Sequence, residues 1–192
     1  MKYIRRFLWF IASKLLLFSL IAALFILAFY LAMNAANIFM LLSDGMKQRA
    51  DVILTREEPD YLNEFFRKEF LDRDEVLRVA LSPDSPYIDY RITGFESSVQ
   101  MEWVWSWPWE DVAQATIIHR VPVIKGSALS SKSALVKSGK ISATPPRWEG
   151  GRYEVELLRV NGQWKIVSMK QTQIIVDATP APLPTIVPTP AT

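Results

Sequence analysis

The sequence predicts an α+β protein in which an N-terminal transmembrane helix precedes helices packed on an antiparallel sheet. Three observations lead to this fold class. An uncharged, strongly apolar run covers residues 15–43. Helix-start signals and apolar residues at helical spacing follow in residues 55–83, and apolar–polar alternation dominates from residue 87 to residue 176. Helices and strands segregated along the chain are typical of α+β folds.

The first element is a membrane anchor, which we predict over residues 15–36. About 20 apolar residues span a hydrocarbon core of ~30 Å as a helix, and Leu15–Met33 supplies them. Residues 1–14 carry four Lys or Arg and no acid, so the positive-inside rule places them in the cytoplasm and the later chain outside. We therefore expect a single-pass protein of the cell membrane whose first partner is the lipid bilayer. A cleaved signal peptide and a buried core helix are the alternatives, and the apolar run is long for both.

Helices are expected directly after the anchor. Residues 37–55 are predicted to form a juxtamembrane helix with a weak point at Asp44-Gly45, and the extracytoplasmic domain is predicted to span residues 56–177. Thr55 and Glu58 have the spacing of a capping box. One face of the helix that follows carries Tyr61, Leu62, Phe65, Phe66 and Phe70, and a shorter helix is expected at 76–81.

Five strands are expected after the helices. The Asn161-Gly162 pair predicts a tight hairpin between the last two, because both central residues of such a turn need positive φ. Pro108 is expected to end a strand. The predicted strands cover residues 87–95, 99–107, 112–124, 153–160 and 163–176. The tail, residues 178–192, holds five prolines and four threonines and is expected to be disordered.

Composition excludes several function classes. The 192-residue chain has no cysteine, so thiolate catalysis and Cys-based zinc sites are excluded. It has one histidine, so a Ser–His–Asp triad has only one candidate base. Residues 44–192 carry 18 basic and 20 acidic residues, whereas a nucleic-acid-binding domain needs a positive excess on its folded surface. We therefore expect no nucleic-acid partner. The absence of metal-ligand spacing and of a phosphate-binding glycine loop predicts no cofactor and no metal.

The segment 125–152 is the one locally basic stretch outside the N-terminus. It carries six Lys or Arg residues against the single acid Glu149. A solvated loop with short strand pieces, such as 134–136, is the simplest interpretation. The alternative is a contact with anionic lipid headgroups or an anionic wall polymer. The candidate contact residues are Lys132, Lys137 and Lys140.

The order of helices followed by a sheet that closes in a hairpin resembles the nuclear transport factor 2-like fold, also called the cystatin-like cone. The segment Tyr153–Val167, which runs YEVELLRVNGQWKIV, is similar to the final hairpin of many such domains. The resemblance covers roughly residues 50–176 and implies helices packed across a strongly curved sheet. Anchored members include extracytoplasmic domains of Gram-positive conjugation-channel and envelope proteins, whereas soluble members include isomerases, dehydratases and hydrolases.

Two features are candidate functional residues. His119 shares strand parity with Ile117 and Val121, so it is expected to face the apolar interior, where a histidine is usually a hydrogen-bonded core residue. Four tryptophans recur at every second position from Trp103 to Trp109. We expect Trp103 and Trp105 to be buried under the helix that carries Phe65, Phe66 and Phe70. Trp107 and Trp109 are expected to be partly exposed, as a platform for a protein, a glycan or a membrane interface.

The leading hypothesis is a non-catalytic, membrane-anchored extracytoplasmic module that acts as an interaction or scaffold subunit of a bacterial envelope assembly, with a protein partner. The alternative is a small-molecule-binding or hydrolase/isomerase-type domain that uses the cone cavity, with His119 as its polar participant. A wall- or lipid-contacting protein that uses residues 125–152 is a third hypothesis. A filled interior favours the first hypothesis, and an open polar cavity around His119 favours the second.

Overall fold

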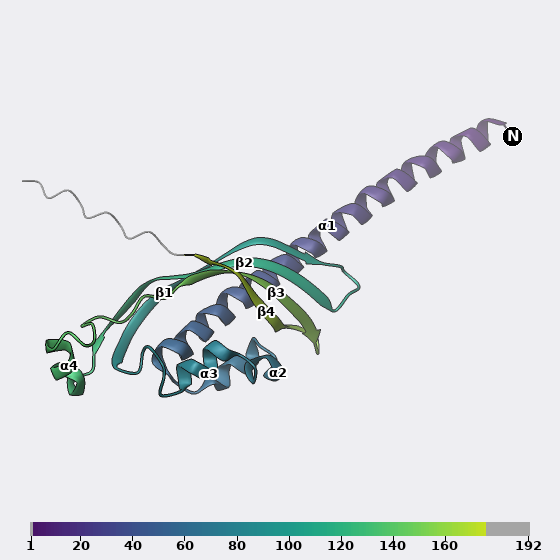
Figure 1. Cartoon of the computed structure of the whole chain (residues 1–192). Coiled ribbons are helices and arrows are strands. Elements are labelled where there is room, and N and C mark those ends of the chain that lie inside the picture. Colours follow the sequence, from purple (N-terminus) through teal and green to yellow (C-terminus); the bar gives the residue numbers. More distant parts are fainter. Residues whose placement is uncertain (1, 176–192) are drawn as a thin grey trace, which may run out of the picture.

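The computed structural model describes residues 2–175 and confirms an α+β fold (Figure 1). A long helix, α1 (Lys2–Thr55), is followed by three short helical segments and then by a four-stranded antiparallel sheet. The helical segments are η1 (Pro59–Glu64), α2 (Lys68–Leu71) and α3 (Glu75–Leu81), and a further pair, η2 (Ser130–Lys132) and α4 (Ser133–Lys137), interrupts the sheet. The strands are β1 (Tyr90–Ser106), β2 (Val112–Ala128), β3 (Gly150–Val160) and β4 (Gln163–Ile175). The predicted tail, residues 178–192, lies outside the described residues.

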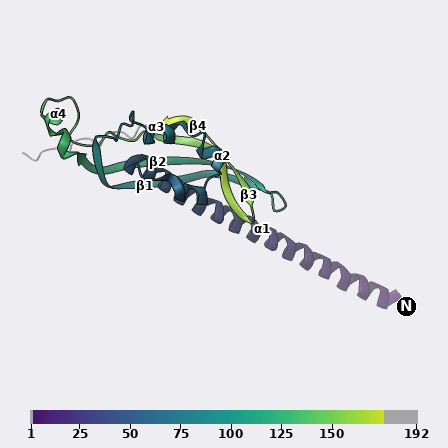
Figure 2. The same ribbon diagram turned by 90° about the horizontal axis from the view of Figure 1, so that it is seen from below.

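The sheet is an open, curved meander in the order β1-β2-β3-β4 (Figure 1). Its ladder shifts register at several places in β1, β3 and β4, and such bulges bend and twist a strand. The second half of α1, together with α2 and α3, lies under the concave face, as Figures 1 and 2 show. Two short turns, 107–111 and 161–162, lie at the end of the sheet nearer the N-terminal half of α1, and α4 lies at the opposite end.

Helix α1 has two halves with different surroundings. Every side chain from Trp9 to Tyr30 is exposed, and α1 is the one helix in the described chain that is long and apolar enough to cross a membrane. From Asn34 onward the helix carries a buried stripe, which comprises Ile38, Leu42, Met46, Ala50, Ile53 and Leu54. The stripe recurs at helical spacing and joins the same hydrophobic core as the inward side chains of the sheet.

The helix continues without a break through Asp44-Gly45, so the predicted weak point there is wrong. A Cβ atom on Gly45 would lie 3.0 Å from the Cβ of Phe65, which indicates that glycine at this position permits close packing of the segment after η1. The expected juxtamembrane helix, 37–55, is thus the central helix of the domain. A domain boundary at residue 56 would divide the hydrophobic core.

The helix starts differ from the prediction. Thr55 ends α1, and Arg56 leaves it at a φ of 61°, so the Thr55–Glu58 capping box does not form. Pro59 begins η1, where its missing N–H group leaves no hydrogen bond unmade. The cap of α3 is Asp74, whose carboxylate accepts hydrogen bonds from the backbone N–H groups of Val76 and Leu77. A capping carboxylate of this kind satisfies N–H groups that the helix itself leaves unpaired.

The strands confirm the final hairpin and correct the other boundaries. Asn161 and Gly162 have φ values of 51° and 82°, as a tight turn between β3 and β4 requires. The two strands predicted at 87–95 and 99–107 are one strand, β1. The strand piece expected at 134–136 is helical and belongs to α4.

The two halves of α1 lead to a prediction about fragments. A soluble fragment of residues 34–177 should fold and unfold cooperatively, because it retains the buried stripe of α1. The fragment 56–177, cut at the boundary expected from sequence, should not fold, because the concave face of the sheet loses its main cover. Circular dichroism during heating measures both. A cooperative transition for 56–177 would show that α1 is dispensable for the core.

Candidate functional site

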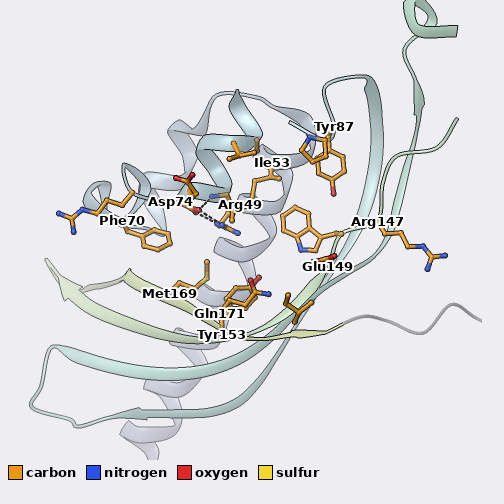
Figure 3. Close-up of a pocket in the computed structure, with 18 residues that line it drawn as sticks. Arg49, Ile53, Phe70, Asp74, Tyr87, Arg147, Glu149, Tyr153, Met169 and Gln171 are labelled. Carbon is orange, nitrogen blue, oxygen red and sulfur yellow. Dashed lines mark hydrogen bonds and ion pairs between the residues drawn. The ribbon is translucent and has the colours of Figure 1, made fainter. Parts of the chain in front are cut away.

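An open cleft of about 620 Å³ lies between the helices and the concave face of the sheet (Figure 3). α1 and α3 form one wall, and β3, β4 and the segment 147–149 form the other. The lining is mostly apolar, with Ile53, Phe70 and Met169 among its members. A cleft of this size has room for a small organic molecule or a few side chains of a peptide.

A buried ion pair stands in the wall of the cleft. The Nε atom of Arg49 donates to Oδ2 of Asp74 at 2.6 Å, and Nη2 donates to Oδ1 at 2.9 Å. Both side chains are almost fully buried. The pair joins α1 to the start of α3, and removing one partner of such a buried pair typically costs about 3–5 kcal/mol.

The carboxylate of Asp74 accepts further hydrogen bonds besides those from Arg49. Its Oδ1 atom also accepts the backbone N–H groups of Val76 at 3.1 Å and Leu77 at 3.2 Å. Together with the two bonds from the Arg49 guanidinium, these bonds occupy both oxygen atoms of the carboxylate. The arrangement is structural, because every donor that reaches the carboxylate also fixes the position of a helix.

Two tyrosines from opposite walls also line the cleft. Tyr87 precedes β1 and Tyr153 lies on β3. Burial raises the pKa of Tyr87 to about 12. Burial also raises the pKa of Tyr153, against the opposing charge of the nearby Arg49. Both phenols therefore stay neutral at physiological pH and present hydroxyl groups rather than charges.

His119 lies on β2 in the floor of the domain and is fully buried. Its Nε2 atom is 3.0 Å from the hydroxyl oxygen of Ser97, and its ring meets the ring of Trp148 edge-on at 6.1 Å. Within the described residues, its Nδ1 atom has no hydrogen-bond partner. The expectation that His119 faces the apolar interior is confirmed.

His119 is not one of the side chains that line the cleft, although its neighbour Trp148 is. Burial lowers the pKa of His119 to about 4, and the positive charge of Arg49 acts in the same direction. The imidazole is therefore neutral at pH 7 and closed off from the cleft. The alternation of side chains along the strand correctly predicted that His119 lies on the inner face of the sheet. It could not show that Trp148 lies against the imidazole.

The tryptophan stripe is arranged differently from the prediction. Val99 and Met101 pair with His119 and Ile117 on the inner face, but the ladder shifts register between Met101 and Trp103. A shift of one residue moves the following side chains to the other face. Trp103 and Trp105, 49% and 44% exposed, therefore lie on the outer face, and the expectation that they are buried under the helix is wrong.

The exposed indoles form a continuous cluster near the β1–β2 turn. Trp107 is 40% exposed and Trp109 is 73% exposed, which confirms the expected exposure of these two. The ring centroids of Trp105 and Trp107 are 5.0 Å apart in an edge-to-face contact, and those of Trp107 and Trp109 are 5.0 Å apart in a stacked contact. We call Trp105, Trp107 and Trp109 the tryptophan tip.

A polar cluster fastens the turn to α1. The Tyr30 hydroxyl donates to the carbonyl oxygen of Pro108 at 3.1 Å, and the Asn34 amide donates to the Ser106 hydroxyl at 2.7 Å. Oδ1 of Asn34 accepts from Nε1 of Trp164 and from Nη2 of Arg159, both at 3.0 Å. Both hairpins are thus attached to one turn of α1.

The basic segment lies far from this turn. Lys132 forms an ion pair with Asp89 at 2.8 Å, and Lys137 is the last residue of α4. Lys140 follows the helix and is exposed. β1 begins at Tyr90 near this end of the sheet and reaches Trp105 of the tryptophan tip 15 residues later, about 50 Å along the strand at ~3.3 Å per residue. The structure does not bring Lys132, Lys137 and Lys140 together with Trp107, Trp109 or His119.

Comparisons with protein-family models, with curated proteins and with solved structures gave no match. Among the described residues, no group of three or more His, Asp or Glu side chains is placed to hold a metal ion.

Sequence reasoning missed Arg49, Asp74 and Asn34, which organise the cleft and the turn. Asp74 carried a detectable signal, because Asp before a short apolar run is a common helix cap. Arg49 and Asn34 carried none, since their partners lie 25 residues or more away in the chain.

The lowered pKa of His119 predicts how stability depends on pH. The folded state binds this proton less readily than the unfolded state, whose histidine pKa is 6.5, so protonation favours unfolding. The stabilising contribution should be complete above pH 6.5 and should be lost as the pH falls toward 4. His119→Gln should therefore show a flatter loss of stability than the wild type between those values, measured by urea unfolding of the full chain in detergent. Parallel curves would mean that His119 titrates normally in the folded protein.

Proposed function

We propose that this protein is a non-catalytic, single-pass, membrane-anchored interaction module of a bacterial envelope assembly, with its N-terminus in the cytoplasm and its folded domain outside. The observation that carries the proposal is the division of α1. Its first half exposes apolar side chains on every side, and its second half is the central helix of the domain. One rigid helix would thus hold the domain at the membrane surface.

The contacts of Tyr30 and Asn34 favour a retained anchor over a cleaved signal peptide. The stretch 33–36 gives no clean small-x-small cleavage site, and cleavage there would remove Tyr30 and would remove or expose Asn34. The bonds from these side chains to Pro108, Ser106 and Trp164 would then be lost or weakened. The cationic residues before the span support the proposed orientation.

The position of the cleft supports an interaction role. Arg49 follows Asn34 by 15 residues, which is about 22 Å along an α-helix, so the cleft would open well above the membrane surface. Asp74 is held by Arg49, and His119 is closed off, so neither supports acid–base chemistry in the cleft. The order of elements in the sequence resembles that of anchored members of the nuclear transport factor 2-like fold, and we propose on this ground that the curved sheet is cone-like and serves the same kind of role.

The alternative is a domain that binds a small molecule, and the cleft is the observation that favours it. Arg73 is among its lining residues beside apolar side chains, which suits an aromatic carboxylate. Figure 3 shows the Arg49 side chain directed toward Asp74 within the cleft, whereas Arg147 extends away from it.

The topology is tested with a reporter fused after Thr192. Alkaline phosphatase should be active there, and β-galactosidase at the same position should be inactive, because the domain is outside. Replacing Lys2, Arg5 and Arg6 with Glu should reduce correct insertion, while Lys2→Arg should leave it unchanged. A cytoplasmic C-terminus would overturn the proposed orientation.

The small-molecule alternative is tested by filling the cleft. Val79→Trp adds bulk to the cleft wall, whereas Arg78→Trp on the same helix adds it outside the lining residues. Aromatic carboxylates that raise the melting temperature of the wild type and of Arg78→Trp, but not of Val79→Trp, would support binding in the cleft. No shift in the wild type across such a panel would leave the interaction role as the better proposal.

A further inference from the structure

We propose that the tryptophan tip is seated in the outer interface of the same bilayer that α1 crosses, with its indoles among the lipid headgroups and upper acyl chains. The inference rests on the proposed membrane anchoring of α1. It assigns to this turn a lipid-binding role that fixes the domain at the membrane by a second contact.

The position of the tip along the axis of α1 can be compared with the thickness of the bilayer. From Leu15 to Asn34 the helix rises about 28 Å, which matches a hydrocarbon core of ~30 Å. Lys14 marks the inner limit, because it is the last charge before the run. Beyond Asn34 one face of the helix is buried in the protein core, so the outer limit lies near Tyr30 to Asn34.

The tip lies at this outer limit. The hydrogen bond from the Tyr30 hydroxyl to the Pro108 carbonyl fixes the centre of the turn beside the last part of the span. The bond from Asn34 to Ser106 fixes the end of β1 one helical turn farther out. Lipid must therefore surround α1 at the height where the tip projects.

The chemistry of the tip suits the interface rather than bulk water. Tryptophan and tyrosine gather at both membrane–water boundaries, because their rings are apolar and carry one polar group. The tip presents three contacting indoles, and Val112 beside it is 50% exposed. Glu110 and Asp111 follow Trp109 directly, which limits the tip to the headgroup region and keeps it out of the hydrocarbon centre.

The position of the tip also decides between possible occupants. A protein partner or a second copy at this height would have to displace lipid from the side of α1. The bilayer is continuous with the apolar surface of the span, so it needs no additional component. The outer face of the sheet becomes charged away from the tip, where Arg152 pairs with Glu102 at 2.7 Å.

Depth-dependent quenching tests the proposal on the full chain in lipid nanodiscs. The chain has no cysteine, so single cysteines at Glu110, Leu24 and Ser138 can each carry an NBD fluorophore. These positions report the tip, the middle of the span and the α4 end. NBD at position 110 should be blue-shifted and quenched more by lipids with a shallow doxyl group than with a deep one. NBD at 24 should show the reverse preference, and NBD at 138 should not be quenched.

The three positions distinguish failure of the membrane anchoring from failure of the proposal about the tip. Loss of quenching at 24 would overturn the membrane anchoring itself. If NBD is quenched at position 24 but is not quenched at position 110, the anchoring holds and the present inference alone is wrong. A blue shift at 110 without quenching would mean that protein, such as a second copy, covers the tip. Quenching at both 110 and 138 would mean that the whole domain lies on the membrane, which also overturns the inference.

Substitution of the indoles gives a second test. Trp105→Ser, Trp107→Ser and Trp109→Ser together should abolish the quenching at 110 while NBD at 24 is still quenched. The three side chains are 40–73% exposed, so the fold should be retained, as the melting temperature would show. Tyr61→Ser with Val76→Ser removes exposed side chains elsewhere and should leave the quenching at 110 unchanged. Full quenching in the triple variant would show that the indoles do not hold the turn in lipid.

Discussion

The packing of the second half of α1 against the concave face of the sheet is the interaction on which the rest of the molecule depends. Ile38, Leu42 and Met46 are fully buried there, and without them the inward side chains of β1 and β2 would face water. The ion pair between Arg49 and Asp74 then attaches α3 to the same helix. Because α1 continues without interruption toward the N-terminus, the packing also fixes where the domain stands relative to the apolar half of the helix.

This arrangement gives the two ends of the sheet different surroundings. The turn end is attached to α1 through Asn34, whose amide forms hydrogen bonds with Ser106, Arg159 and Trp164. The other end carries α4 and the start of β3, and the cleft opens between the two. Under the anchoring that we propose, a domain held in this way would present its cleft at a constant height and orientation.

The sequence predicted features that depend on local chemistry. The final hairpin follows from Asn161-Gly162, the inward direction of His119 follows from strand alternation, and the apolar helix follows from its composition. The sheet face on which Trp103 and Trp105 lie could not be predicted. A bulge in β1 reverses the alternation, and no residue type in the sequence marks its position. The ion pair of Arg49 was equally hidden, since it depends on the approach of two helices that are distant in the chain.

The role of residues 34–43 shows why an uncharged run cannot be divided by composition alone. Lipid and a protein core both accept apolar side chains, so the helix can pass from one environment to the other without a change in residue type. Asn34 is the exception, because an amide needs hydrogen-bond partners when it is buried. The two hairpins supply them, and the same side chain would be costly one turn deeper in lipid. A single buried amide therefore marks the place where the surroundings of α1 change from exposed to packed.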